Sequence, residues 1–146
     1  MKNIKKLLCV VIALISVFAF NACGKTDSNK EKEENTTYPP AKNISIETIH
    51  LDYKKNEIVA KETHIGQRYR ITSYVNDISE DEVVVKELVD IAYIYVHLKY
   101  KDQKDFVRNI TTDNIITFEG TLTDMNYNQL TFEDVIFVSY TTNVQN

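Results

Sequence analysis

The sequence predicts a mainly β fold, a small five-stranded barrel preceded by one amphipathic helix. Three observations lead to this expectation. The chain has 146 residues, which is the size of one ordinary domain and excludes a multidomain enzyme. Its second half contains runs in which apolar and polar residues alternate, the period of a half-buried strand. An earlier segment without Gly or Pro shows the period of a helix instead.

The N-terminus has the parts of a secretory signal. Lys2, Lys5 and Lys6 form a positively charged lead, which is followed by an apolar run of 14 residues, Leu7–Phe20, interrupted only by Ser16. The run is shorter than the roughly 20 residues that a helix needs to cross a bilayer, but it matches the apolar part of a signal peptide. We therefore expect residues 1–22 to direct export out of the cytoplasm.

A cysteine stands where such a signal is cut. The segment Ala22-Cys23-Gly24 resembles the lipobox of bacterial lipoproteins, in which the cysteine thiol is lipidated and the signal is removed just before it. This resemblance implies a lipid anchor on Cys23 that holds the protein at the cell membrane on its extracytoplasmic side, because two or more acyl chains anchor persistently. The alternatives are an uncleaved signal anchor, or secretion with Cys23 as a free thiol.

Residues 23–42 are expected to form a disordered tether that follows the lipidated cysteine. The stretch Gly24–Lys42 contains no large aliphatic residue, and its lysines are balanced by acidic residues, which is typical of a solvated linker. The only other cysteine, Cys9, lies in the segment to be removed. The domain predicted over residues 43–146 therefore has no thiol for a disulfide, a metal site or nucleophilic catalysis.

The domain is expected to begin with a helix between Ser45 and His64. Its apolar stripe is formed by residues spaced near the 3.6-residue period, namely Ile46, Ile49, Tyr53 and Ala60. Asn43 or Ser45 can cap the first turn of this helix, and Gly66 ends it.

Five alternating segments follow the helix and predict the strands of the barrel. They are residues 68–76, 83–85, 92–101, 115–123 and 130–140. The clearest alternation is in residues 92–101, which place Ile94, Val96 and Leu98 toward a core. In the last strand the expected inward residues are Leu130, Phe132, Ile136, Val138 and Tyr140. Glu133-Asp134 interrupts that phase and predicts a bulge of the kind that helps small barrels close.

One helix and five strands in about 100 residues favour a small OB-fold barrel, which has that number of strands. The segment Tyr53–Tyr140 also resembles the tRNA-anticodon-binding-like OB-fold domains found in small bacterial lipoproteins. The likeness rests on Tyr53, Asn56-Glu57, Ala60, Gly66-Gln67-Arg68, the alternating segment Tyr69–Val75 and Glu119-Gly120-Thr121. This resemblance implies the fold and export together, but it implies no particular activity.

The candidate binding residues lie on one face of the third predicted strand. Tyr93, Tyr95, His97 and Lys99 are expected to point outward, and OB-folds bind ligands across the face of strands 2 and 3. Rings and cations there can stack on bases or sugars. Residues of the first strand that can join this face are Arg68, Arg70 and Tyr74. The alternative is that these side chains form ordinary cross-strand pairs on an exposed sheet.

Charge and motif content narrow the function classes. Residues 43–146 carry 10 Lys and Arg against 17 Asp and Glu, a net charge of −7, so nucleic acid ranks low as a partner. His50, His64 and His97 are isolated in the sequence, so no metal or other cofactor is expected. No G-x-S-x-G, P-loop, H-E-x-x-H or Cys/His arrangement occurs either.

The function expected from the sequence is therefore binding rather than catalysis. We expect a lipid-anchored extracytoplasmic adaptor that binds an envelope protein or glycan, with its ligand and oligomeric state undetermined. The alternative is an OB-fold module that binds an oligonucleotide or an oligosaccharide.

Overall fold

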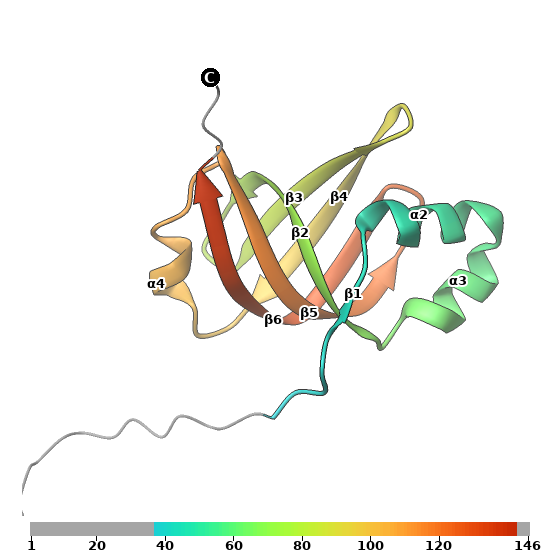
Figure 1. Cartoon of the computed structure of the whole chain (residues 1–146), viewed down its shortest axis with the longest axis horizontal. Coiled ribbons are helices and arrows are strands. Elements are labelled where there is room, and N and C mark those ends of the chain that lie inside the picture. The colour runs from blue at the N-terminus through green and yellow to red at the C-terminus, as the bar shows by residue number, and fades with distance from the viewer. Residues whose placement is uncertain (1–36, 143–146) are drawn as a thin grey trace, which may run out of the picture. The chain divides into compact units, whose positions relative to one another are not determined.

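The computed structural model describes residues 37–142 (Figure 1). The predicted signal peptide, Cys23 and the first part of the tether lie outside the described residues. Within residues 37–142, no helix is both long and apolar enough to cross a membrane.

The strands form one closed barrel. Their bounds are β1 Lys42–Asn43, β2 Arg68–Ile78, β3 Glu82–Val89, β4 Ala92–Tyr100, β5 Asn114–Met125 and β6 Gln129–Thr142. The sheet order is β1-β2-β3-β4-β6-β5, and an additional β2–β5 pairing closes the last five strands into a ring. Strands β4 and β6 are parallel, and the other neighbours in the ring are antiparallel. This strand order is that of an OB-fold, so the predicted fold class is confirmed.

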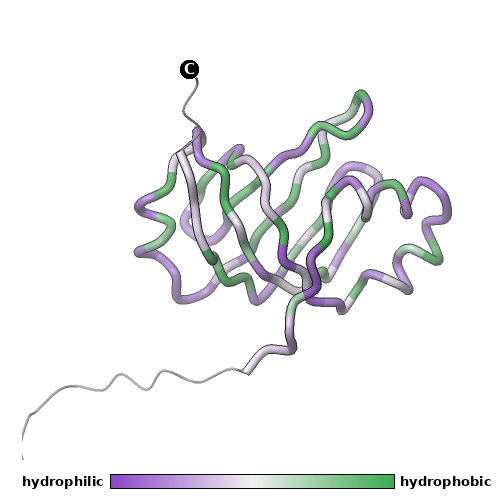
Figure 2. The backbone as a smooth tube through the Cα atoms, in the orientation of Figure 1, coloured by the Kyte–Doolittle hydropathy of each residue, from purple (hydrophilic) through white to green (hydrophobic). Residues whose placement is uncertain are grey.

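The barrel interior is filled by the inward residues of each strand. Apolar and polar residues alternate along the strands (Figure 2), and the interior side chains include Ile71, Val85, Ile94, Val96, Leu98, Ile116, Phe118, Leu122 and Phe132, all at most 2% exposed. Phe118 and Phe132 meet edge to face, with ring centroids 5.5 Å apart. Burial of each large apolar side chain contributes about 1.5–3 kcal/mol to folding, which makes this interior the main source of stability.

The bulge predicted in the last strand is present. It reverses which of the following side chains face the core. Asp134 has a φ of 50°, and the β5–β6 register shifts between the pairs Glu119↔Ile136 and Thr121↔Glu133. The one extra residue of β6 between these pairs turns Val135 and Phe137 inward. The expectation that Ile136, Val138 and Tyr140 face the core is therefore wrong, because it continued the alternation without this shift.

The predicted helix is two helices. They are α2, Ile46–Lys55, and α3, Glu57–His64, and they are separated by Asn56. Asn56 has extended backbone angles, φ −161° and ψ 101°. Its side chain accepts a hydrogen bond from the backbone N–H of Val59 at 3.2 Å, so it ends one helix and caps the next.

Helices α2 and α3 lie at one end of the barrel (Figure 1). Ile46 and Ile49 of α2 are fully buried. Lys54 forms an ion pair of 2.8 Å with Asp90 in the β3–β4 turn. The short helix α4, Lys104–Val107, lies at the other end, and its Val107 belongs to the core. The sequence did not predict α4 because four residues are too few to show a helical period.

Candidate functional site

The strand register brings aromatic residues together on the outer surface of β2, β3 and β4. Tyr74 of β2 pairs with Lys86 of β3, and Lys86 pairs with Tyr95 of β4. Neighbouring strands are about 4.8 Å apart, so the two tyrosines lie roughly 10 Å apart with the lysine between them. The next outward pair along β3 and β4 is Leu88 with Tyr93. We call the surface formed by Tyr74, Lys86, Leu88, Tyr93 and Tyr95 the aromatic face.

The aromatic face is open to solvent. Tyr74 and Tyr93 are each 50% exposed, and Leu88 is 57% exposed. The β3–β4 hairpin projects from the body of the barrel (Figure 1), and Ile91 at its turn is 98% exposed. Tyr93 and Tyr95 thus point outward as predicted. The apolar residues Leu88 and Ile91 are also exposed here, and they were not among the predicted site residues.

Lys86 is the cation of the aromatic face. Its Nζ lies 5.5 Å from the centroid of the Tyr93 ring, a cation–π contact. Among the described residues it makes no ion pair, whereas Arg70 and Lys99, two other outward cations, do. Lys86 is absent from the face predicted from the sequence because the second strand was expected only over residues 83–85. The alternation of Val83, Val85 and Val89 around it was the signal that extends this strand.

A cleft of about 610 Å³ adjoins the aromatic face. It lies where β2 leaves β5, beyond their last pair, Tyr74 with Ile115. The lining residues are Tyr74, Val75, Asn76, Lys86, Thr112, Asp113 and Thr142. The cleft therefore shares Tyr74 and Lys86 with the aromatic face and adds hydroxyl, amide and carboxylate groups that can exchange hydrogen bonds with a polar ligand.

His97 and Lys99 point outward beside the aromatic face but are engaged with carboxylates. His97 Nδ1 lies 3.0 Å from Glu82 Oε1, and Lys99 Nζ lies 3.5 Å from Glu133 Oε1. The cross-strand pairing that was considered as an alternative therefore describes these two residues, and it also describes Tyr93, whose ring contacts Lys86 of the neighbouring strand.

Arg68 and Arg70 do not join the aromatic face. They lie on the part of β2 that pairs with β5, opposite Thr121 and Glu119. Arg70 Nη2 lies 2.6 Å from Glu119 Oε1. Arg68 was expected to be exposed on the outer surface, but its side chain is only 2% exposed. The ring of Tyr38 covers it, with the guanidinium carbon 4.3 Å from the ring centroid.

A chain of hydrogen bonds joins the partly exposed Asp52 to the buried His64 and Tyr69. His64 Nε2 lies 3.2 Å from Asp52 Oδ2, and His64 Nδ1 lies 2.8 Å from Tyr69 Oη. The order resembles that of a catalytic triad, but Tyr69 is inside the barrel and 4% exposed. Burial also raises the pKa of the Tyr69 hydroxyl above its ordinary value. A group that is buried and held protonated is a poor nucleophile, so we assign this chain to stability.

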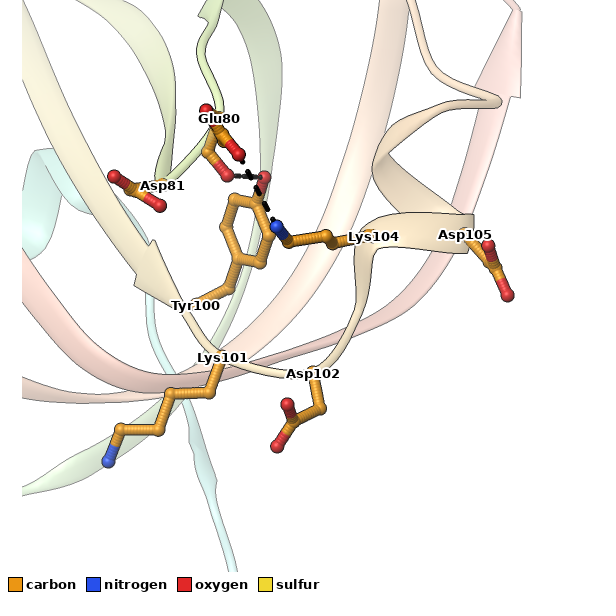
Figure 3. A pocket seen from close by; sticks show the side chains of 7 residues that line it. All are labelled: Glu80, Asp81, Tyr100, Lys101, Asp102, Lys104 and Asp105. Atoms are coloured by element: carbon orange, nitrogen blue, oxygen red, sulfur yellow. Dashed lines mark hydrogen bonds and ion pairs between the residues drawn. The ribbon is translucent and has the colours of Figure 1, made fainter.

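A second, smaller cleft of about 360 Å³ lies between the β2–β3 turn and α4 (Figure 3). The Tyr100 hydroxyl is 2.6 Å from the backbone oxygen of Glu80, and Lys104 Nζ is 3.5 Å from the Glu80 carboxylate. The other lining residues are Asp81, Lys101, Asp102 and Asp105. The polar groups at its centre are paired with one another, so this cleft contains solvated ion pairs.

Comparison with known proteins identifies no family. No family model and no curated protein match the chain. A protein described as an aspartyl-tRNA synthetase from Leishmania major Friedlin is similar at 12% identity over 77% of this chain and 23% of its own, with a TM-score of 0.42. U. maydis Replication protein A bound to single-stranded DNA is similar at 10% identity over 70% of this chain and 77% of its own, with a TM-score of 0.39. The OB-fold assignment itself rests on the strand order and register.

The expectation that nucleic acid ranks low as a partner is wrong. It rested on the net charge of residues 43–146 and gave too little weight to the fold, because OB-folds, whose strand order this chain has, bind oligonucleotides as well as oligosaccharides. Net charge is also a poor guide here because the cations are clustered. Those that touch Glu119 or the β6 bulge are Arg68, Arg70, Lys99 and Lys101. The acidic composition therefore excludes no class of ligand.

Proposed function

We propose that this protein is a lipid-anchored, extracytoplasmic OB-fold binding protein that acts by binding rather than by catalysis. The observation that carries the binding part is the row Tyr74–Lys86–Tyr95 across three strands, next to a cleft that shares two of its residues. The outer surface of these strands is where OB-folds bind their ligands.

The aromatic face favours a ligand with flat rings. A tyrosine ring offers an apolar surface for stacking, at a small cost in side-chain entropy, and stacking on one ring contributes about 1–3 kcal/mol in single-stranded nucleic acid complexes. Sugar rings and the aromatic or proline side chains of a protein present comparable flat surfaces. Lys86 adds one positive charge, which forms no ion pair among residues 37–142. We infer that the ligand is an envelope protein or glycan. The alternative is an oligonucleotide, which also presents flat rings.

The anchor part of the proposal rests on the sequence alone. The positively charged lead, the apolar run Leu7–Phe20 and Ala22-Cys23-Gly24 agree with one another as a lipoprotein signal. In this proposal the first 22 residues are removed and Cys23 carries the acyl chains. The barrel is then held near the outer surface of a membrane, where envelope partners are at high local concentration.

Binding is tested with the full-length chain and a panel of labelled probes. The panel contains a single-stranded DNA oligomer and neutral and charged glycans, measured by fluorescence anisotropy, and an envelope extract, measured by pull-down. We expect at least one probe to bind, and the double variant Tyr74→Ala/Tyr95→Ala to weaken that binding by roughly tenfold or more, since two stacking contacts are lost.

Tyr140→Ala is the matched control. Tyr140 is also an exposed strand tyrosine, 44% exposed, but it lies on β6 and outside the aromatic face. It should leave binding unchanged. Equal binding by the double variant and the parent, with both folded by circular dichroism, removes the aromatic face as the site.

The anchor is tested by the mass of the protein extracted from membranes. The proposal expects loss of residues 1–22 and the added mass of acyl groups on Cys23, and Cys23→Ser should abolish both changes. A full-length mass without acyl groups would refute the anchor and leave the binding proposal standing.

A further inference from the structure

Arg68 is a buried cation with an unused hydrogen-bonding edge. Its side chain is 2% exposed. Nη1 donates to the backbone oxygen of Asp134 at 3.1 Å, but Nε and Nη2 have no hydrogen-bond partner among the described residues. These two nitrogens form one side of the planar guanidinium, and their N–H groups point in the same direction. That side matches the two oxygens of a carboxylate or phosphate group.

The nearest acidic group does not fill this position. Glu119 Oε2 is 3.8 Å from Arg68 Nη2, which is beyond hydrogen-bond distance. The Glu119 carboxylate instead binds Arg70, whose Nε and Nη2 lie 2.8 and 2.6 Å from Oε1. A buried donor without a partner destabilises the fold, because it has lost its hydrogen bonds to water and gained none. An incoming anion that satisfied both N–H groups would recover that free energy.

The charges around Arg68 favour an anion, although the domain as a whole is acidic. The charged groups around Arg68 are those that pair with Glu119 on β5 and those that pair at the β6 bulge, which Arg68 reaches through the backbone oxygen of Asp134. The cations are Arg68, Arg70, Lys99 and Lys101, and the carboxylates are Glu119, Glu133 and Asp134. Four positive groups against three negative groups leave a local excess of one positive charge.

Tyr38 lies against Arg68 and precedes the first strand. The guanidinium carbon is over its ring, 4.3 Å from the ring centroid. The segment that follows it is attached to β2 through the short parallel strand β1, with the two pairs Lys42↔Tyr69 and Asn43↔Arg70. Lys42 Nζ also donates to Gln67 Oε1 at 2.9 Å. A ligand can therefore reach Arg68 by displacing the Tyr38 ring and the residues beside it, and the strands of the barrel stay paired.

We propose that the Nε and Nη2 edge of Arg68 is a binding site for one carboxylate or phosphate group, and that Tyr38 is a cover which the anion displaces. This site is on the β2–β5–β6 side of the barrel and is independent of the aromatic face. It accounts for a buried guanidinium with two unsatisfied donors and for an aromatic ring placed on that guanidinium. Tyr38 and the anion compete for the same cation.

The test titrates the full-length chain in neutral detergent with inorganic phosphate and, separately, with acetate. The readout is the NMR resonance of the Arg68 Nε–H group. We expect this resonance to shift with at least one anion, and the comparison of the two identifies phosphate or carboxylate as the preferred group. Tyr38→Ala should lower the Kd about fivefold, because loss of the cation–π contact removes about 1 kcal/mol of competition.

Two variants serve as controls. Tyr38→Phe keeps the ring and should bind like the parent. Arg68→Lys keeps the charge but loses the two-donor edge, and it should abolish binding. If Arg68→Lys does not fold, the comparison of Tyr38→Ala with Tyr38→Phe decides. Equal affinities in that comparison, or no shift of the Arg68 resonance with either anion, would overturn the proposal.

Discussion

The imidazole of His64 lies with its Nδ1 2.8 Å from the hydroxyl of Tyr69, and this contact joins the last turn of α3 to the start of β2. The other ring nitrogen faces Asp52 of α2 at 3.2 Å. A carboxylate only accepts hydrogen bonds, so in the neutral imidazole Nε2 donates to Asp52 and Nδ1 accepts from Tyr69. The helix pair is thus attached to the barrel by a chain of side chains in which every polar group is satisfied.

Tyr69→Phe should destabilise the protein. The substitution keeps the ring in the core but leaves Nδ1 of the buried His64 without a donor, at a cost of about 1–2 kcal/mol. Chemical denaturation followed by circular dichroism measures this difference. Tyr93→Phe is the control, because Tyr93 is half exposed and its hydroxyl keeps water as a partner. An equal and small effect of both substitutions would contradict this role of the Tyr69 hydroxyl.

The decrease of the free energy of unfolding at acid pH should depend on Asp52. The hydrogen bond from His64, with a smaller contribution from Lys55, lowers the pKa of the Asp52 carboxyl below its ordinary value of 3.8. The stabilisation is therefore fully present above the ordinary pKa and is lost as the pH falls through the lowered one. Asp52→Asn should be less stable than the parent at pH 7, and the difference should shrink toward acid pH. A difference that stays constant with pH would show that the charge of Asp52 is not involved.

Glu87→Gln should stabilise the protein at neutral pH. Burial, and next the charge of Glu47, raise the pKa of the Glu87 carboxyl above its ordinary value of 4.5. The folded state then binds a proton more tightly than the unfolded state, so stability falls as the pH rises from the ordinary pKa through the raised one. The glutamine removes this penalty, and its advantage should vanish in acid. Glu62→Gln, on an exposed position of α3, should change little at either pH.

The β4 part of the candidate site was predictable because its pattern is local. Strict alternation over β4 is enough to place Tyr93, Tyr95, His97 and Lys99 outward and Ile94, Val96 and Leu98 inward, as the structure has them. The same reasoning failed in β6, where a bulge of the predicted kind changed which residues follow it into the core. Alternation fixes a face only up to the next register shift.

The remaining features depend on contacts between distant parts of the chain. Lys86 joins the aromatic face only because β3 lies between Tyr74 and Tyr95. The pairing of the strands decides this, and the pattern within a single segment does not show it. Arg68 is buried by Tyr38, 30 residues earlier in the sequence, in a stretch whose composition is typical of a linker. The break at Asn56 was locally visible as a capping residue, but the apolar spacing continues across it and favoured one helix.

Gly120→Ala should destabilise the barrel, because the inward face of β5 has no room for a methyl group at this position. A Cβ placed on Gly120 would lie 3.0 Å from Val135 Cγ2 and 3.3 Å from Phe132 Cβ. Val135 is the residue that the β6 bulge turns inward, so the glycine and the bulge fit one another. Overpacking of a core by one methyl group costs about 1–3 kcal/mol, which thermal or chemical denaturation would detect.

A double-mutant cycle separates this overcrowding from a general sensitivity of the strand. Val135→Ala removes the closest contacting atom, so adding Gly120→Ala in that background should cost less than in the parent, with a coupling of about 0.5–3 kcal/mol. Phe132 and the backbone oxygen of Glu133 at 3.4 Å remain in place, so the relief should be partial. Strictly additive effects would mean that Val135 is not what excludes a side chain at residue 120.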